Sequence, residues 1–325
     1  MKEIQFREAV CEAMSEEMRR DDSVFLLGEE VAEYNGAYKA SKGMLDEFGA
    51  ERVIDTPIAE LGFASIAVGA AMNGLRPIVE FMTWNFAILA ADQIINHAAK
   101  MLQMSGGQYS CPMVFRGPNA TAGQLAATHS QSFESMYAHI PGLKVVTPSN
   151  PADMKGLLKA AIRDDNPVLV MESEKMYGDK GQVPEGEYIV PIGKADVVRE
   201  GSDITIISFG KVMKTAHEAA DELEKEGFKP EVIDLRTIRP LDVETIVNSI
   251  KKTNRCIIIE EAFPYASISS EIAYRIQKEA FDYLDAPVVR VTQSDTPFAF
   301  STSLIEEAYP SVETTVKRAK EIMYV

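Results

Sequence analysis

The sequence predicts an α/β protein with two domains, and three observations support this fold class. Apolar, strand-like segments such as 24–28 and 77–86 alternate with helix-like segments, which is typical of a parallel sheet covered by helices. A chain of 325 residues is long for one hydrophobic core and suits two. A stretch rich in Gly, Pro and charge separates two such alternations. We therefore predict domains at 1–180 and 193–325, joined by a linker at 181–192.

Composition and charge exclude several classes of protein. With 46% hydrophobic and 25% charged residues, the chain has the composition of a globular protein. Its net charge of −16 argues against binding to nucleic acid or to an anionic membrane surface. Three isolated cysteines favour a reducing compartment over a disulfide framework or a zinc site. Residues 1–20 have the spacing of an amphipathic helix and not of a signal peptide, so we expect a cytoplasmic protein.

Glu60 is the first candidate functional residue. A β-branched pair at 53–54 leads to Thr56, which can cap a helix, and Pro57, which suits a first helical position. Glu60 then falls in the first turn of a helix whose following residues, 61–72, are almost all apolar or small. A carboxylate there either complements the helix dipole or serves chemistry, because a desolvated Glu needs a donor or a proton.

The next strands end near further candidate residues. A strand at 77–86 carries Phe81, Trp84 and Phe86 at its end, and a helix is predicted over 87–107. Ligands of open α/β sheets lie beyond the carboxyl ends of the strands, so these aromatic side chains either contact a ligand or pack in the core.

A long loop follows the third strand, 111–117. It covers 118–142 and contains His129, one of only four histidines. A structureless segment of this length is uncommon unless it is functional or mobile. His129 is either a solvated loop residue or a group for proton transfer. A strand, a helix that ends at 164–167 and another strand complete the domain.

The second domain repeats the alternation. Strands are predicted within 203–210, 229–238, 255–263 and 286–292, separated by helices and followed by a final helix from Ser311. We find no GxGxxG or GKS/T motif, which argues against a nicotinamide-dependent dehydrogenase.

Several motifs occur in the order and spacing of a known family. DTPIAELGF, GLRPIVEF, DQIINHAAK and HSQSFE resemble those of the β subunits of thiamine-diphosphate-dependent 2-oxoacid dehydrogenases, across essentially the whole chain. The resemblance implies a pyrimidine-binding thiamine-diphosphate fold followed by a smaller transketolase carboxyl-terminal-like domain. It also implies oxidative decarboxylation, with pyruvate as the expected substrate. Two alternatives remain: a β subunit of a branched-chain 2-oxoacid or acetoin dehydrogenase, and a non-catalytic scaffold subunit.

The resemblance assigns roles to particular residues. It implies that Glu60 bonds to the aminopyrimidine ring of the cofactor, that Phe86 stacks on that ring and that Ile58 lines it. His129 is expected to serve proton transfer and the passage of the acyl group to lipoamide. Thr128 and Met136 depart from the residues of many relatives. In relatives a structural potassium ion is held by backbone carbonyls at positions that align with Met113, Ala161, Ile162, Asp164 and Asn166.

One motif of the wider family is missing. The GDG segment that binds diphosphate and Mg²⁺ is absent, and the nearest string, at 177–181, lacks its pattern. The resemblance therefore implies an E1 α subunit that holds the diphosphate end and Mg²⁺, in an α2β2 heterotetramer. It also implies an E2 dihydrolipoamide acyltransferase as a further partner, which would dock on acidic residues of the carboxyl-terminal domain.

Overall fold

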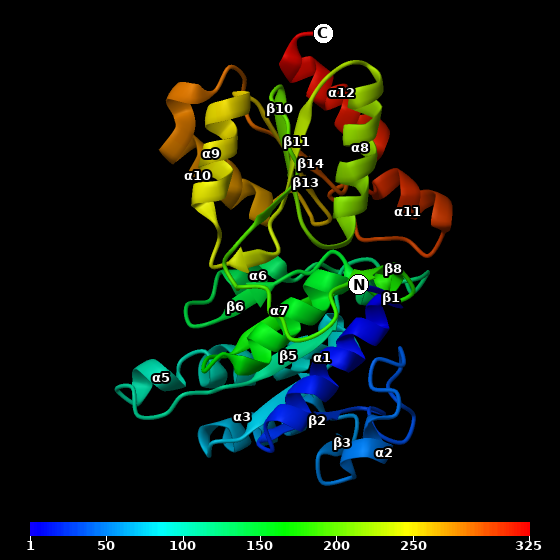
Figure 1. The fold of residues 1–325 in the computed structure, drawn as a ribbon, viewed down its shortest axis with the longest axis vertical. Coiled ribbons are helices and arrows are strands. Elements are labelled where there is room, and N and C mark those ends of the chain that lie inside the picture. Colours follow the sequence, from blue (N-terminus) through cyan, green and yellow to red (C-terminus); the bar gives the residue numbers. More distant parts are fainter.

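A computed structural model describes residues 1–325 as two α/β domains stacked along the long axis of the molecule. In Figure 1 the first domain, blue to green, forms the lower half, and the second, yellow-green to red, forms the upper half. The chain contains a seven-stranded sheet, a five-stranded sheet and a two-stranded pair. The predicted α/β class with two sheets is thus present. None of its helices combines the length and the apolar character needed to cross a bilayer.

The first domain contains eight strands and seven helices. The strands are β1 (Lys2–Gln5), β2 (Val24–Gly28), β3 (Val53–Asp55), β4 (Arg76–Glu80), β5 (Val114–Pro118), β6 (Lys144–Val146), β7 (Val168–Glu172) and β8 (Lys180–Val183). The helices are α1 (Phe6–Arg20), α2 (Met44–Phe48), α3 (Glu60–Met72), α4 (Trp84–Ala87), α5 (Met101–Met104), α6 (Glu134–Ala138) and α7 (Pro151–Arg163).

The second domain contains the remaining elements. Its strands are β9 (Asp196–Arg199), β10 (Ile204–Ser208), β11 (Pro230–Asp234), β12 (Thr237–Arg239), β13 (Cys256–Glu260) and β14 (Val289–Thr292). Its helices are α8 (Met213–Lys225), α9 (Val243–Thr253), α10 (Ile268–Ala280), α11 (Thr302–Ala308) and α12 (Val312–Met323). The helix expected from Ser311 is confirmed, because the Ser311 hydroxyl accepts the Thr314 N–H and caps α12.

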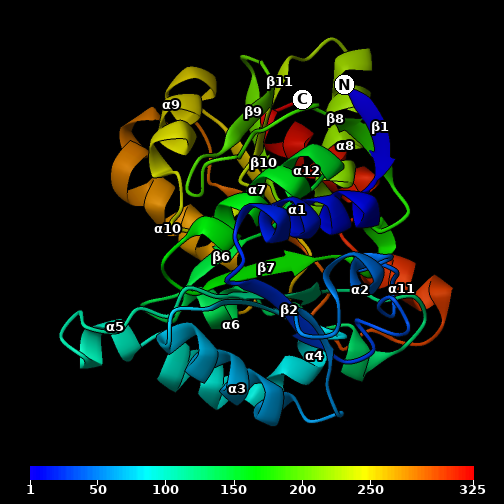
Figure 2. The same cartoon turned by 60° about the horizontal axis from the view of Figure 1, so that its bottom comes forward.

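The large sheet has the strand order β12-β6-β7-β5-β4-β2-β3. All neighbouring pairs from β6 to β3 are parallel, and only β12 is antiparallel. Parallel strands are buried on both faces and alternate side chains between them. Leu27 and Val79 accordingly join one hydrophobic cluster with α3, whereas Leu26 and Ile78 join another with α1 and α7. Figure 2 shows α3 on the face of this sheet opposite α1 and α7.

The two domains are connected by more than the linker. Strand β12 leaves the second domain and pairs with β6 at the edge of the first sheet. One hydrophobic cluster also contains both Phe115 of the first domain and Ile258 of the second. The second domain therefore has a fixed contact with the β6 edge of the first sheet.

Several predicted boundaries were wrong for identifiable reasons. The helix expected over residues 1–20 begins at Phe6, because Lys2–Gln5 pair with β8, which also takes up the start of the predicted linker. Thr56 does not cap a helix; its N–H donates to Gly28 O, and α3 begins at Glu60. The strand predicted over 77–86 ends at Glu80, since Thr83 caps α4.

Two longer predicted segments also differ in detail. The helix expected over 87–107 is divided into a 3₁₀ turn, a π-helical segment and α5. The loop expected over 118–142 contains a 3₁₀ turn at Ala127–His129 and the short helix α6.

Candidate active site

The candidate residues come together at one edge of the first sheet. Because β3, β2, β4 and β5 are parallel neighbours, their carboxyl ends lie at the same edge. Glu29 follows β2, Glu60 follows β3, Phe86 follows β4 and His129 follows β5. The sequence predicted Glu60 in the first turn of a helix, Phe86 at the end of a strand and His129 in the loop after a strand. Glu29 was missed, although this residue directly follows a strand.

Glu60 is a buried carboxylate without a protein partner. It begins α3, it is 5% exposed and no hydrogen bond or ion pair reaches it. Glu29 lies close enough for the two charges to interact, and its own Oε1 is buried without a hydrogen-bond partner. Burial, and then the charge of Glu60, raise the pKa of Glu29 to about 7. The unpaired carboxylate of Glu60 is suited to accept a hydrogen bond from a bound ring.

Phe86 and His129 form the second part of the site. Their ring centroids are 5.2 Å apart and their planes are inclined by 80°, an edge-to-face contact. Both side chains line a cavity of ≈ 210 Å³ together with Tyr38, Leu125 and Glu174. His129 Nδ1 lies 3.1 Å from the hydroxyl of Thr128, so the residue that departs from many relatives contacts the imidazole.

The remaining sequence-predicted residues lie outside this cavity. The side chain of Ile58 is on the surface, with the residue 83% exposed, and Glu60 also does not line the cavity. Phe81 and Trp84 are fully buried, with ring centroids 5.7 Å apart, so the core-packing interpretation is correct for both. The structure therefore contains two residue pairs, Phe86 with His129 and Glu60 with Glu29. Both pairs lie at the edge formed by the carboxyl ends of the first sheet.

A buried ion cluster supports the strand ends beneath the site. Arg116 of β5 donates two hydrogen bonds of 2.6 Å to Glu172 of β7 and pairs with Glu80 of β4. The Tyr177 hydroxyl donates to Glu172 at 2.7 Å. All three charged residues are at most 4% exposed. Sequence reasoning missed this cluster, because each residue sits in a different apolar strand.

His129 lies on a loop, residues 119–133, which we call the histidine loop. At its base Asn119 donates to Glu134 Oε1 at 2.7 Å and accepts the Phe133 N–H at 3.1 Å. Burial raises the pKa of Glu134 to about 8, with further contributions from Glu260 and Glu261.

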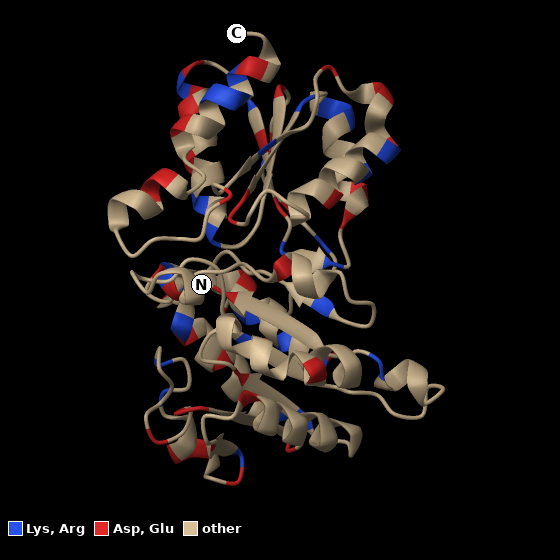
Figure 3. Ribbon diagram, turned by 180° about the vertical axis from the view of Figure 1, so that it is seen from behind, with Lys and Arg blue, Asp and Glu red and all other residues tan.

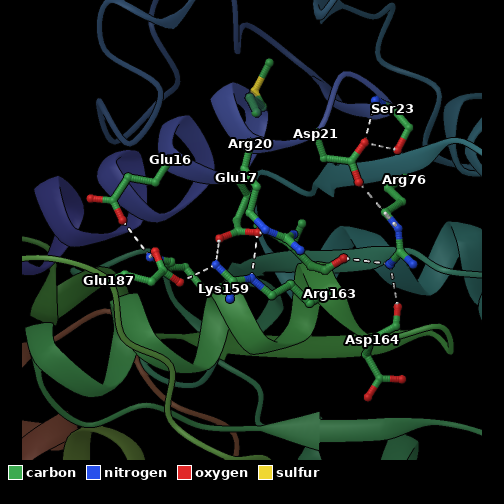
Figure 4. Close-up of polar contacts among 12 residues, drawn as sticks. Glu16, Glu17, Arg20, Asp21, Ser23, Arg76, Lys159, Arg163, Asp164 and Glu187 are labelled. Atoms are coloured by element: carbon green, nitrogen blue, oxygen red, sulfur yellow. Dashed lines mark hydrogen bonds and ion pairs between the residues drawn. The ribbon is translucent and has the colours of Figure 1, made fainter.

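The backbone carbonyls expected to hold potassium are close to a positive charge of the protein. Arg76 Nη1 donates to Ile162 O at 3.0 Å and to Asp164 O at 3.1 Å, and Figure 4 shows this guanidinium beside the end of α7. Met113 O accepts the Val168 N–H at 3.0 Å. Each carbonyl keeps a second lone pair. No group of three or more His, Cys, Asp or Glu side chains is arranged to hold a metal ion.

Comparison with known proteins places this geometry in a family. Residues 2–180 match the model of a transketolase pyrimidine-binding domain, and residues 193–314 match that of a transketolase C-terminal domain. A protein of Rhizobium meliloti named pyruvate dehydrogenase E1 component subunit beta is 55% identical over 98% of this chain and 69% of its own length. A Rickettsia felis protein of the same name is 53% identical over 99% of both chains. The chain belongs to this family of E1 β subunits.

This result confirms the family that the motifs predicted. The similarity extends to eukaryotic relatives, since the mitochondrial E1 β protein of Saccharomyces cerevisiae is 51% identical over 98% of this chain. A solved structure described as a split gene transketolase, inactive beta4 tetramer, has a TM-score of 0.82 and covers 99% of this chain and 98% of its own. At 23% identity this similarity shows the fold alone, and it confirms the predicted two-domain transketolase-like architecture.

Proposed function

We propose that this E1 β chain is the β subunit of a pyruvate dehydrogenase, which decarboxylates pyruvate oxidatively and passes the acetyl group to a lipoyl group of E2. The observation that carries the proposal is the Glu60 carboxylate, which is buried, lacks a protein donor and begins the helix that carries the family motif. The names and the identity of the relatives, 51–55%, support pyruvate as the substrate.

The family fold supports dependence on thiamine diphosphate, and the residues present fit its pyrimidine half. When bound, this cofactor supplies the carbanion chemistry. Glu60 would accept a hydrogen bond from the pyrimidine ring, which provides the donor that the protein lacks. Phe86 offers an aromatic ring at the wall of the cavity, and Ile58 offers an exposed apolar side chain. His129, held against Phe86, would transfer a proton as the acyl group leaves for the lipoyl sulfur.

An α subunit would complete the site. Helix α3 carries no charged residue after Glu60, and Figure 3 shows it as an uncharged segment of the first domain. Ile58, Leu61 and Ile66 are each at least 50% exposed at this edge, as is Leu89 on the adjacent turn. An apolar surface of this kind beside a catalytic carboxylate is typical of a subunit interface. We assign the diphosphate and Mg²⁺ to the α subunit, in an α2β2 assembly.

The other expected partners also remain proposals. A potassium ion would take the second lone pairs of the carbonyls of Met113, Ala161, Ile162, Asp164 and Asn166, with Arg76 as a neighbour. An E2 acyltransferase would dock on the second domain, where Glu271, Glu279 and Asp282 are exposed and could attract a basic surface. We place the complex in the cytoplasm because the cysteines are free and unpaired.

The decisive experiment measures reduction of an artificial electron acceptor by the chain co-purified with its α subunit, with thiamine diphosphate and Mg²⁺. Pyruvate is compared with 2-oxoisovalerate and acetoin. We expect a clear preference for pyruvate. A preference for the branched acid or for acetoin would change the substrate and keep the family, whereas no activity in an assembled complex would indicate a non-catalytic subunit.

A further inference from the structure

The hydrogen bonds from the histidine loop to the second domain all go to a single residue, Glu261. The Thr121 N–H donates to Glu261 Oε1 at 2.8 Å. The Ser132 hydroxyl donates to the backbone carbonyl of the same residue. Thr121 is fully buried and Glu261 is 5% exposed, so water does not compete freely for these bonds. One residue thus contacts both ends of the loop that carries His129.

Glu261 is itself fixed by its own domain. It directly follows β13, and Lys211 Nζ donates to its Oε1 at 3.0 Å and lies 2.8 Å from its Oε2. The Tyr309 hydroxyl donates to the same oxygen at 3.4 Å, and the Lys211 ammonium lies 4.8 Å from the centroid of the Tyr309 ring. A buried carboxylate requires such partners. Its Oε1 therefore presents a fixed, charged acceptor to the first domain.

The histidine loop depends on external contacts to keep its shape. Ala120, Gln124 and Ala126 have φ values of 64°, 52° and 63°, in the left-handed region that residues with a Cβ rarely adopt. The first domain holds the loop near its ends, through Asn119 N–H to Glu172 O at 2.8 Å and Gln131 Nε2 to Asn85 Oδ1 at 3.1 Å. Within the loop, Gly123 N–H makes only a long bond to the Glu174 carboxylate, at 3.4 Å. The bond from Thr121 N–H to the Glu261 carboxylate is shorter, at 2.8 Å, so it is the stronger of these two charge-assisted restraints.

We propose that Glu261 is a positioning residue of the second domain, which holds the histidine loop so that the His129 imidazole stays against Phe86. The inference rests on the proposed role of His129 in acyl transfer. It gives the second domain a part in the reaction beyond its possible contacts with other proteins. Movement of Glu261 relative to the first sheet would change the placement of His129.

The test compares four variants in the complex with the α subunit. Glu261→Ala removes the acceptor, and Glu261→Gln keeps an oxygen for the Thr121 N–H but loses the charge. Ser132→Ala removes the second bond without changing the second domain. Glu260→Gln is the matched control, because Glu260 is an adjacent buried carboxylate that accepts the Ile268 and Ser269 N–H groups of α10 and makes no hydrogen bond to the histidine loop.

Two readouts separate positioning from general stability. Hydrogen exchange of residues 119–133 reports the restraint, and acetylation of a free lipoyl domain is compared with pyruvate-dependent reduction of an artificial acceptor. We expect Glu261→Ala to raise exchange in this loop and to lower kcat for acetylation at least tenfold, with a smaller loss in acceptor reduction. Glu261→Gln and Ser132→Ala should show smaller effects in the same direction, and Glu260→Gln should match the wild type.

Specific results would overturn the proposal. Unchanged hydrogen exchange of residues 119–133 in the Glu261→Ala variant would show that Glu261 does not restrain the histidine loop. Raised exchange with unchanged acetylation would show that the restraint does not position His129. A wild-type complex without activity on pyruvate would overturn the proposed function instead, and loop exchange would still decide whether Glu261 restrains the loop.

Discussion

The ring of Phe86 contacts the imidazole of His129 edge to face, with centroids 5.2 Å apart. This contact joins the segments that follow β4 and β5, two neighbouring parallel strands. It holds the His129 imidazole at the wall of a cavity while leaving the side chain half-buried.

Removal of the His129 imidazole should impair acetylation of the lipoyl group and leave binding of thiamine diphosphate unchanged. We expect His129→Ala to lower acetylation of a lipoyl domain by about 10²-fold or more, because general acid–base catalysis contributes about 10²–10⁴-fold. Binding of thiamine diphosphate, measured by calorimetry on the complex, should change little. His97→Ala, at an exposed histidine of a helical segment, is the control. Equal acetylation rates in the two variants would exclude the role assigned to His129.

The carboxylate of Glu60 should be essential to catalysis and not to assembly. We expect Glu60→Gln to lower kcat with pyruvate by at least about 10²-fold, since an amide cannot replace an anionic acceptor. The mass of the α–β complex, measured by light scattering, should be unchanged. Glu244→Gln is the matched control, because Glu244 is an exposed residue in the first turn of α9. Full activity of Glu60→Gln would refute the assigned mechanism.

The ion cluster of Arg116 should be necessary for stability. Arg116→Met leaves the carboxylates of Glu80 and Glu172 buried without a cation, and we expect a loss of about 3–5 kcal/mol in the free energy of unfolding. Arg318→Met removes an exposed pair with Glu321 and should cost less than about 1 kcal/mol. Denaturant unfolding of both variants measures the difference. Equal midpoints would mean that the cluster contributes little.

Glu134 should make stability depend on pH. Its folded pKa is about 8 and its ordinary value is 4.5, so the folded chain keeps a proton that the unfolded chain releases. This contribution is complete below pH 4.5 and is lost as pH rises towards 8. Glu134→Gln keeps an oxygen for Asn119 and removes the titration. We therefore expect its Tm, relative to the wild type, to rise between pH 5 and 8, whereas Glu279→Gln, at an exposed position, should run parallel to the wild type.

A potassium ion at the end of α7 should be visible as a salt-specific effect. We expect a higher Tm in KCl than in choline chloride at equal ionic strength, because a ligand at about 100 times its Kd stabilises by about 2.7 kcal/mol. Arg76→Ala removes the guanidinium from Ile162 O and Asp164 O. The Tm difference between the two salts, measured for this variant, tests whether binding of potassium depends on the Arg76 guanidinium. Identical melting curves in the two salts would argue against the ion.

Much of the fold could be predicted from the sequence because strands and helices have local signatures. The strand β2 and the helix α7 begin and end within one or two residues of expectation, since apolar runs and capping residues mark them. The errors lie where a distant segment decides the outcome. Residues 2–5 form a strand only because β8, almost 180 residues later, pairs with them.

The candidate site was predicted in the same uneven way. Motifs identified Glu60, Phe86 and His129, and strand order explains why their segments meet. Glu29 and Arg116 were missed, because a charged residue in or after an apolar strand has no signal of its own until its partner is known. Ile58 was identified by resemblance and lies on the surface of this chain, at the edge where a second subunit is proposed.

The sequence by itself determined the alternation of strands and helices, the family of the chain and the residue types at its candidate site. Periodicity and motifs are local properties, so they can be recognised in the sequence without knowing which distant segments are in contact. Only the tertiary structure decided that Glu29 lies beside Glu60, that Arg116 pairs with Glu172 and that Thr121 bonds to Glu261, 140 positions away. These choices follow from which segments pack together, since a buried charge or N–H group is stable only where folding brings it a partner.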